Sequence, residues 1–196
     1  MKIAFDENMP ATLVRVFQAL AKEHGFRRHF MNVEIVSSKD YSPSLGDPDF
    51  VSKSDVPWLV RYKRDGGRIV VSGDTKMPDV PQELRAIVDG GLVAFFFPNQ
   101  WNKWKFPRKS ALILVWLERI IEEARASRPG SLYRIPHNWS PDAAFLRINE
   151  PTPLRLLERE HHVRPKKAIP KPTQKRKPIL QQADLLESPA GLHQRE

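Results

Sequence analysis

The chain has 196 residues, enough for one ordinary domain with an appendage and too few for two domains of typical size. It has no cysteine, which excludes disulfides, thiolate catalysis and cysteine-bound zinc, so any metal must be held by oxygen or imidazole ligands. The formal net charge is +9, of which residues 151–196, with 10 basic and 5 acidic side chains, carry +5. A chain this basic is expected to have a polyanionic partner such as RNA or DNA.

No apolar run approaches the ~18 residues needed to cross a bilayer. The N-terminus also lacks the basic region, apolar stretch and cleavage site of a secretory signal. The sequence therefore predicts a cytoplasmic protein without a membrane segment.

The N-terminal part of the chain predicts a strand, a helix and a second strand, in that order. Residues 2–5 form a short apolar run that is typical of a buried strand. In residues 11–25 the apolar side chains recur at helical spacing, and Gly25 is placed to end the helix. Residues 29–37 are enriched in β-branched side chains and predict the second strand.

Further strands and helices follow a polar loop. The loop over residues 38–55 is rich in Pro, Gly, Ser and Asp, and Ser54 or Asp55 is placed to cap a helix that runs to Arg64. The next elements are predicted as a strand, a helix and a strand at 68–72, 79–89 and 92–97.

The last predicted elements are a buried helix at 110–126, whose first half is apolar on every side, and a short strand at 131–135. From about residue 150 the chain is basic and punctuated by proline, without a periodic apolar pattern, as in a disordered segment or a partner-binding arm. We predict a folded domain over residues 1–135 and a C-terminal extension over 136–159. A basic, Pro-rich disordered tail is predicted over 160–196.

Strands and helices that alternate, with strands that are apolar throughout, are typical of a parallel sheet covered on both faces. The predicted fold class is therefore α/β, a three-layer sandwich with a mainly parallel central sheet.

Three aspartates are expected to meet at one edge of this sheet. Asp6 and Asp74 each follow a predicted strand, and Asp55 lies at the start of a helix that could face the same crevice. Open parallel sheets bind ligands at the carboxyl ends of their strands. Because clustered carboxylates are unfavourable without a cation, and oxygen ligands suit hard ions, these residues predict a Mg²⁺ or Mn²⁺ site.

Each acid also has a simpler interpretation when it is taken alone. Asp6 and Glu7 could accept hydrogen bonds from the free amides of a helix start, and Asp55 could cap its own helix. Asp74 could be a turn residue, and Asp47 and Asp49 could be solvated loop residues. The metal site is preferred because two acids end the two clearest strands and the chain has no glycine-rich phosphate loop.

The chain resembles the small PIN-like proteins whose first strand ends in a D-E-N-x-P motif. The resemblance is carried by Asp6-Glu7-Asn8-Met9-Pro10, by the Ser54-Asp55 helix start and by the run from Arg68 to Asp74, and it extends over about residues 1–125. Such proteins are similar to the PIN-domain ribonuclease toxins of bacterial toxin–antitoxin pairs. In those toxins an acidic pocket binds Mg²⁺ or Mn²⁺ and cleaves RNA.

The resemblance implies specific roles for residues of this chain. Asp6, Asp55 and Asp74 would be catalytic metal ligands, Glu7 would support them, and Asn8 and Thr75 would position water or phosphate by hydrogen bonds. The sequence departs from the family pattern in two ways. The candidate for the fourth acid is Asp79, beyond Met77-Pro78, and the middle helix has no glutamate unless Asp55 replaces it.

RNA-binding residues are predicted on a helix, beside the acids and in a loop. The segment from Trp101 to Phe106 interleaves aromatic and basic side chains, which suits base stacking and phosphate neutralisation, although packing of the tryptophans against the 110–126 helix is the alternative. Basic residues on the middle helix could contact the RNA backbone or form a solvated face. The predicted set is Arg61, Lys63, Arg64, Lys76, Trp101, Lys103, Trp104 and Lys105.

Three functions are compatible with these observations. The first is a Mg²⁺- or Mn²⁺-dependent endoribonuclease, the toxin of a toxin–antitoxin pair, with RNA as substrate, a cognate antitoxin as partner and a homodimer as its assembly. The second is a non-catalytic PIN-like module that binds RNA or an antitoxin. The third is a receiver-like phosphoacceptor domain, which lacks the expected lysine on a late strand because Lys76 follows Asp74 almost immediately.

Overall fold

The structure is a computed structural model that describes residues 1–30, 32–137, 139–140 and 143–148. Within these residues the chain forms a six-stranded sheet in the order β2-β1-β3-β4-β5-β6. Strands β1 to β5 run parallel to their neighbours, and β6 pairs with β5 in the antiparallel direction. The strands are Lys2–Phe5 (β1), Glu34–Ser37 (β2), Ile69–Ser72 (β3), Val93–Phe96 (β4), Leu132–Arg134 (β5) and Leu146–Arg147 (β6).

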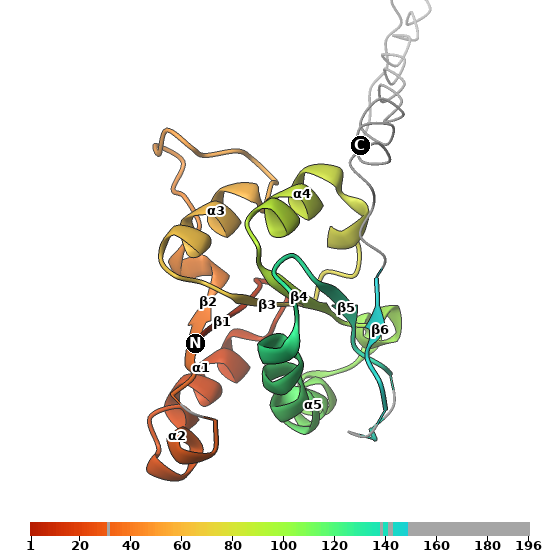
Figure 1. Ribbon diagram of the computed structural model, residues 1–196. Helices are drawn as coiled ribbons and strands as arrows, with labels where there is room; N and C mark the ends of the chain where they lie inside the picture. The colour runs from red at the N-terminus through yellow and green to blue at the C-terminus, as the bar shows by residue number, and fades with distance from the viewer. Residues whose placement is uncertain (31, 138, 141–142, 149–196) are drawn as a thin grey trace, which may run out of the picture. The chain divides into compact units, whose positions relative to one another are not determined.

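Helices cover both faces of the sheet, so the predicted α/β three-layer fold with a mainly parallel sheet is confirmed (Figure 1). Helices α3 and α4 lie on one face, and α1 and α5 pack on the other with their own apolar core. The helices are Ala11–Leu20 (α1), His24–Phe30 (α2), Val56–Arg64 (α3), Pro81–Asp89 (α4) and Phe106–Ala126 (α5). Short 3₁₀ turns are Ser38–Asp40 (η1), Met77–Asp79 (η2) and Asn99–Lys103 (η3).

The apolar runs form the centre of this sheet as predicted. Every residue of β3 and β4 is buried, which explains why residues 69–71 and 93–96 are continuous apolar runs and do not alternate with polar residues. Helix α5 starts earlier than predicted, at Phe106, because Pro107 fits the first helical turn.

The region between the first two strands differs from its prediction. The helix expected over 11–25 ends at Leu20, and residues 24–30 form a separate helix, so the strand expected over 29–37 begins only at Glu34. Phe26 and Phe30 lie four residues apart on α2 with ring centroids 4.3 Å from each other. This i,i+4 aromatic pair favours a helical turn at residues whose composition suggested a strand.

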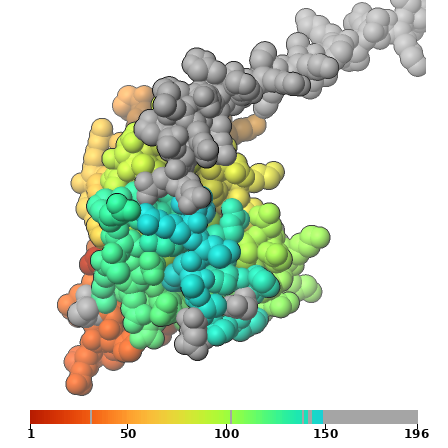
Figure 2. Space-filling view, turned by 45° about the vertical axis from the view of Figure 1, so that its right-hand side comes forward, coloured from red at the N-terminus to blue at the C-terminus, as the bar shows by residue number. Residues whose placement is uncertain are grey.

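Residues after 135 extend the sheet. Strand β6 adds to β5, and Phe145 packs on Trp116 of α5 and on Phe95 of β4. Figure 2 shows this segment (cyan) on the surface beside α5 (green). The predicted tail, 160–196, lies outside the described residues.

Tyr62 fixes α3 on the sheet. Its hydroxyl lies 2.7 Å from the carbonyl oxygen of Lys2 in β1 and 2.8 Å from that of Ile69 in β3. Gly67 passes so close that a Cβ there would lie 2.5 Å from the Tyr62 ring. The N-terminus of α3, with Asp55, is therefore held in a defined position relative to the first and third strands.

Candidate active site

Asp6 connects the carboxyl ends of β1 and β3. Its side chain is only 3% exposed and accepts hydrogen bonds from Ser72 Oγ (2.5 Å), Gly73 N (3.0 Å), Asp74 N (3.1 Å) and Asn8 Nδ2 (3.4 Å). Burial raises the pKa of the Asp6 carboxyl, and these hydrogen bonds oppose the rise. The predicted meeting of Asp6 with the Asp74 segment is thus present, but the Asp6 carboxylate meets the Asp74 backbone.

A pocket of about 500 Å³ opens beside this junction. Four carboxylates from separate segments line it: Glu7 follows β1, Asp55 precedes α3, Asp74 follows β3 and Glu83 lies in the first turn of α4. Asn8, Lys53 and Lys76 also line the pocket. The carboxyl ends of the strands therefore carry an acidic pocket with basic side chains among its walls.

Asp55 and Glu83 are the most constrained of these acids. Glu83 is 6% exposed, and its Oε1 accepts a hydrogen bond from the backbone N–H of Asp55 at 3.3 Å. The Asp55 carboxylate accepts a hydrogen bond from Trp58 Nε1 at 2.8 Å and does not cap its own helix by a side-chain bond. The capping alternative considered for Asp55 therefore does not describe the structure.

Burial and mutual repulsion raise the pKa values of this pair. Burial raises the pKa of Glu83 to about 7, and the negative charges of Asp55 and Asp74 add to the shift. Burial likewise raises the pKa of Asp55, with Glu7 and Asp74 contributing in the same direction. A cation in the pocket would offset this repulsion.

The donor set was compared with what a divalent ion needs. The acids offer only oxygen ligands, which suit Mg²⁺ or Mn²⁺. The pKa values of Asp55 and Glu83 are raised mainly by burial, and a bound cation would favour the charged forms of both carboxyls. Within the described residues, however, no three His, Asp or Glu side chains are already grouped closely enough to hold a metal ion. The chemistry of the pocket fits such an ion, and the acids would have to draw together around it.

The supporting residues predicted from the sequence divide between the pocket and its surroundings. Glu7 and Asn8 are exposed at the pocket, whereas Asp79 is exposed in η2 and does not line it. Thr75 is buried and lines a neighbouring pocket of about 390 Å³ on Asp74, together with Asn8, Lys76 and Lys109. Lys109, from the first turn of α5, was not predicted.

Glu83 is the acid that sequence reasoning missed. It lies next to Leu84 and four residues before Ile87, which are both buried, so it occupies the apolar face of α4. A carboxylate on the buried face of an amphipathic helix is the signal that could have identified it.

The predicted RNA-binding residues on α3 have different environments. Arg61 is held by two carboxylates of the preceding loop: its Nη2 lies 2.8 Å from Asp47 Oδ2, and its Nε donates to Asp49 Oδ2 at 2.8 Å. Asp47 and Asp49 thus bind the loop to α3, a role that the solvation alternative did not include. Lys63 and Arg64 are exposed.

The tryptophan loop is largely packed. Trp101 is 1% exposed and contacts Phe97 in the core, which agrees with the packing alternative and leaves little of its ring for an RNA base. Trp104 is half-buried, stacks on Trp101, and has the Arg108 guanidinium 3.7 Å above its ring centre. Lys103 and Lys105 are exposed.

The raised pKa of Glu83 predicts an unusual pH dependence of stability. Between its ordinary value near 4.5 and about 7, the folded protein binds more protons at Glu83 than the unfolded chain does, so folding becomes less favourable as pH rises. The free energy of unfolding of the wild type should therefore fall by about 3 kcal/mol across this pH window, and that of Glu83→Gln should not. Urea unfolding of both proteins in metal-free buffer from pH 4 to 8 measures this difference. If the free energy of unfolding changes with pH in the same way for both proteins, the prediction is wrong.

The fold and the pocket define the class of protein. It is an α/β protein with a mainly parallel sheet and a set of acids at the carboxyl ends of the strands. Residues 1–99 match the family model described as PIN-like domain, and the chain belongs to the PIN-like domain family. Comparison with curated proteins and with solved structures gave no match.

The family match confirms the resemblance inferred from the D-E-N-x-P start. It gives no support to the receiver-like alternative. No helix among the described residues is long and apolar enough to cross a membrane.

Proposed function

We propose that this protein is a metal-dependent endoribonuclease that acts in the cytoplasm as the toxin of a bacterial toxin–antitoxin pair. The observation that supports the proposal most is the pocket that Asp55, Asp74 and the buried Glu83 line together beside the carboxyl ends of β1 and β3. Membership of the PIN-like family agrees with it. RNA is the proposed substrate, a cognate antitoxin the proposed partner and a homodimer the proposed assembly.

In this proposal Asp55, Asp74 and Glu83 would hold Mg²⁺ or Mn²⁺. Asp6 remains a candidate ligand and also fixes the backbone of Asp74 by a 3.1 Å hydrogen bond. The ion, when bound, supplies activation of a water and compensation of charge on the phosphate.

The chain's own basic residues would bind the substrate. Lys76 lines both pockets beside Asp74, and Lys109 lines the smaller one, so two ammonium groups could neutralise phosphates of the RNA backbone. Asn8 lines the same two pockets and can donate a hydrogen bond from its amide. These residues would place a phosphodiester against the acids.

The test is cleavage of a labelled single-stranded RNA by the purified protein. We expect cleavage with Mg²⁺ or Mn²⁺, none with EDTA, and none by Asp74→Asn, because that change removes a charged oxygen ligand from the pocket. If Asp74→Asn cleaves RNA as fast as the wild type, the acid pocket is not the nuclease site. For the toxin role, induced wild-type protein should arrest bacterial growth, and Asp74→Asn should not.

A second candidate function is a non-catalytic module that binds RNA or an antitoxin. It is favoured by one observation: within the described residues no three acids are grouped as a formed metal site. Retention of RNA that weakens steeply with salt, without cleavage under any divalent metal, would support this function over the first.

A further inference from the structure

The loop over residues 41–55, between η1 and α3, gives the acidic pocket an apolar wall. Phe50 and Val51 of this loop line the same pocket as Asp55 and Glu83. Phe50 is 37% exposed and Val51 is 55% exposed, so both side chains are accessible to a ligand. Ligand pockets commonly join apolar walls to a few placed polar groups, and this pocket has both.

Arg61 of α3 holds this loop in place. Its Nε donates to Asp49 Oδ2 at 2.8 Å, and its Nη2 donates to Asp47 Oδ2 at 2.8 Å. Asp47 also accepts a side-chain hydrogen bond from Ser44 N at 3.0 Å, and Phe50 N donates to the Asp47 carbonyl at 3.0 Å. The Arg61 guanidinium lowers the pKa values of both aspartates, so these ion pairs persist into acidic solution. The loop is therefore fixed on α3 immediately before its two apolar residues.

The chain turns after Phe50 and Val51 and brings a basic residue to the same pocket. Ser54 N donates to the Val51 carbonyl at 3.3 Å, and Lys53 has a φ of 60°, a left-handed conformation that lysine rarely adopts. Lys53 lines the pocket, and Lys76 lines it from the segment after β3. Neither lysine forms an ion pair with a carboxylate of the described residues. The pocket thus joins an accessible aromatic ring to two ammonium groups.

We propose that Phe50 and Val51 form a subsite for one unpaired base of the RNA, next to the phosphate held at the acids. The subsite rests on the proposed nuclease function, because RNA is taken as the substrate. Aromatic side chains stack on unpaired bases, and basic groups beside them neutralise the phosphates. The pocket volume of about 500 Å³ is within the usual range for ligand binding. Because a duplex keeps its bases stacked inside the helix, the subsite selects single-stranded RNA.

In this arrangement Arg61 is a positioning residue and does not itself bind RNA. Its guanidinium is engaged by Asp47 and Asp49, so its charge is already compensated. It acts on RNA through the loop that carries Phe50. This role differs from the contact to the RNA backbone that its place on a basic helix predicted.

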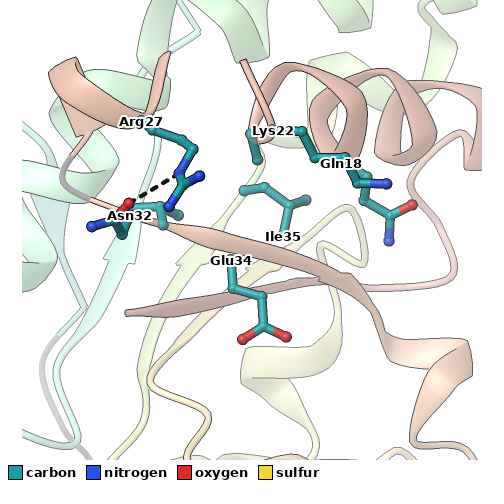
Figure 3. A pocket seen from close by; sticks show the side chains of 8 residues that line it. Gln18, Lys22, Arg27, Asn32, Glu34 and Ile35 are labelled. Carbon is teal, nitrogen blue, oxygen red and sulfur yellow. Dashed lines mark hydrogen bonds between the residues drawn. The ribbon is translucent and has the colours of Figure 1, made fainter. Parts of the chain in front are cut away.

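Two other surfaces each offer one half of this chemistry. A pocket beside β2, lined by Lys22 and Arg27, also has a volume of about 500 Å³, but no aromatic residue lines it (Figure 3). Trp139 is 43% exposed and stacks on Trp104 with ring centroids 6.2 Å apart, but neither tryptophan lines the acidic pocket. Phe50 is the exposed aromatic residue that adjoins the acids.

The first measurement is binding of a short fluorescein-labelled single-stranded RNA, by fluorescence anisotropy in EDTA. Phe50→Ala should weaken binding at least about fivefold, since loss of one stacked base has about that effect or more, and Phe50→Trp should retain binding. Leu45→Ala is the matched control, because Leu45 belongs to the same loop and is 84% exposed but does not line the pocket. Circular dichroism of each variant checks folding.

Photocrosslinking locates the base. RNA that carries 5-iodouridine is irradiated with the protein, and the crosslinked tryptic peptide is identified by mass spectrometry. Cleavage after Lys39 and Lys53 releases residues 40–53, which include Phe50, and we expect this peptide to carry the crosslink. Phe50→Ala should abolish the crosslink, whereas Arg27→Gln, in the pocket beside β2, should leave it unchanged.

A double-mutant cycle tests the role of Arg61. If Arg61 acts through the loop, Arg61→Gln should weaken binding by the wild type but have less than about a twofold effect in the Phe50→Ala protein. If Arg61 contacts a phosphate directly, the two losses of affinity should multiply, and the positioning role is then wrong.

The subsite is overturned if the wild type does not bind the RNA, or if Phe50→Ala binds it as tightly as Leu45→Ala does. It is also overturned if the crosslink maps to Trp104 or Trp139, or if the same RNA annealed to its complement binds equally well. Binding is measured without metal. A protein that binds RNA through Phe50 but cleaves none with Mg²⁺ or Mn²⁺ would therefore contradict the nuclease proposal and support the subsite.

Discussion

Replacing Asp6 by alanine is expected to lower the free energy of unfolding by about 3 kcal/mol. The change leaves the Ser72 hydroxyl and the Gly73 N–H without the acceptor that they share, in a region where Asp6 is 3% exposed, whereas Asp74 N–H keeps its 3.0 Å hydrogen bond to Ser72 Oγ. Each unpaired buried donor costs about 1–3 kcal/mol. Relief of the unfavourable burial of the Asp6 carboxylate offsets part of this cost. Urea unfolding at pH 7 measures the difference.

The control for this experiment is Asp79→Ala. Asp79 is an exposed residue of η2 outside the acidic pocket, so its replacement should change stability by less than about 0.5 kcal/mol. A double-mutant cycle between Asp6 and Ser72 isolates their 2.5 Å hydrogen bond. If Asp6→Ala is as stable as the control, the hydrogen bonds of Asp6 between the ends of β1 and β3 do not stabilise the fold.

Replacing Glu83 by glutamine is expected to slow RNA cleavage by at least about 100-fold at low Mn²⁺. The amide keeps the size of the side chain and its carbonyl can still accept the hydrogen bond from Asp55 N, but the negative charge is lost. Because the proposed role is to help hold the ion, higher Mn²⁺ should restore part of the rate. Measuring the rate against Mn²⁺ concentration therefore separates weaker metal binding from a damaged fold.

Asp79→Asn is the matched control for Glu83→Gln. Each of the two residues is a candidate for the fourth acid of the site, Asp79 from the sequence and Glu83 from the pocket. We expect Asp79→Asn to cleave RNA at nearly the wild-type rate, since its side chain does not line the pocket. The opposite result, with Asp79→Asn inactive and Glu83→Gln active, would identify Asp79 and not Glu83 as the fourth acid of the site.

The two edges of the molecule have different electrostatic characters. At the strand ends, acids from four segments line one pocket together with basic residues, whereas Arg27 and Lys22 line a separate pocket beside β2. No residue lines both pockets. The net charge of +9 alone would not have separated these two surfaces.

The sequence by itself determined the layered fold and the placement of two acids. Continuous apolar runs at 69–71 and 92–97 are stable only when both faces of a sheet are covered, so the parallel α/β architecture followed from their composition. Asp6 directly follows one buried strand and Asp74 follows another after Gly73, which implied that the two segments would meet, because carboxyl ends of parallel strands share one edge.

Only the tertiary structure decided which side chains share the pocket. Glu83 accepts a hydrogen bond from Asp55 across 28 residues of chain, and Asp6 accepts one from Ser72 across 66. The packing of Leu84 and Ile87 turns the face of α4 that carries Glu83 inward, whereas Asp79 lies exposed in the preceding η2 turn. Local sequence patterns record burial and turns, but they do not record which distant partners a buried carboxylate will meet, because long-range packing determines those contacts.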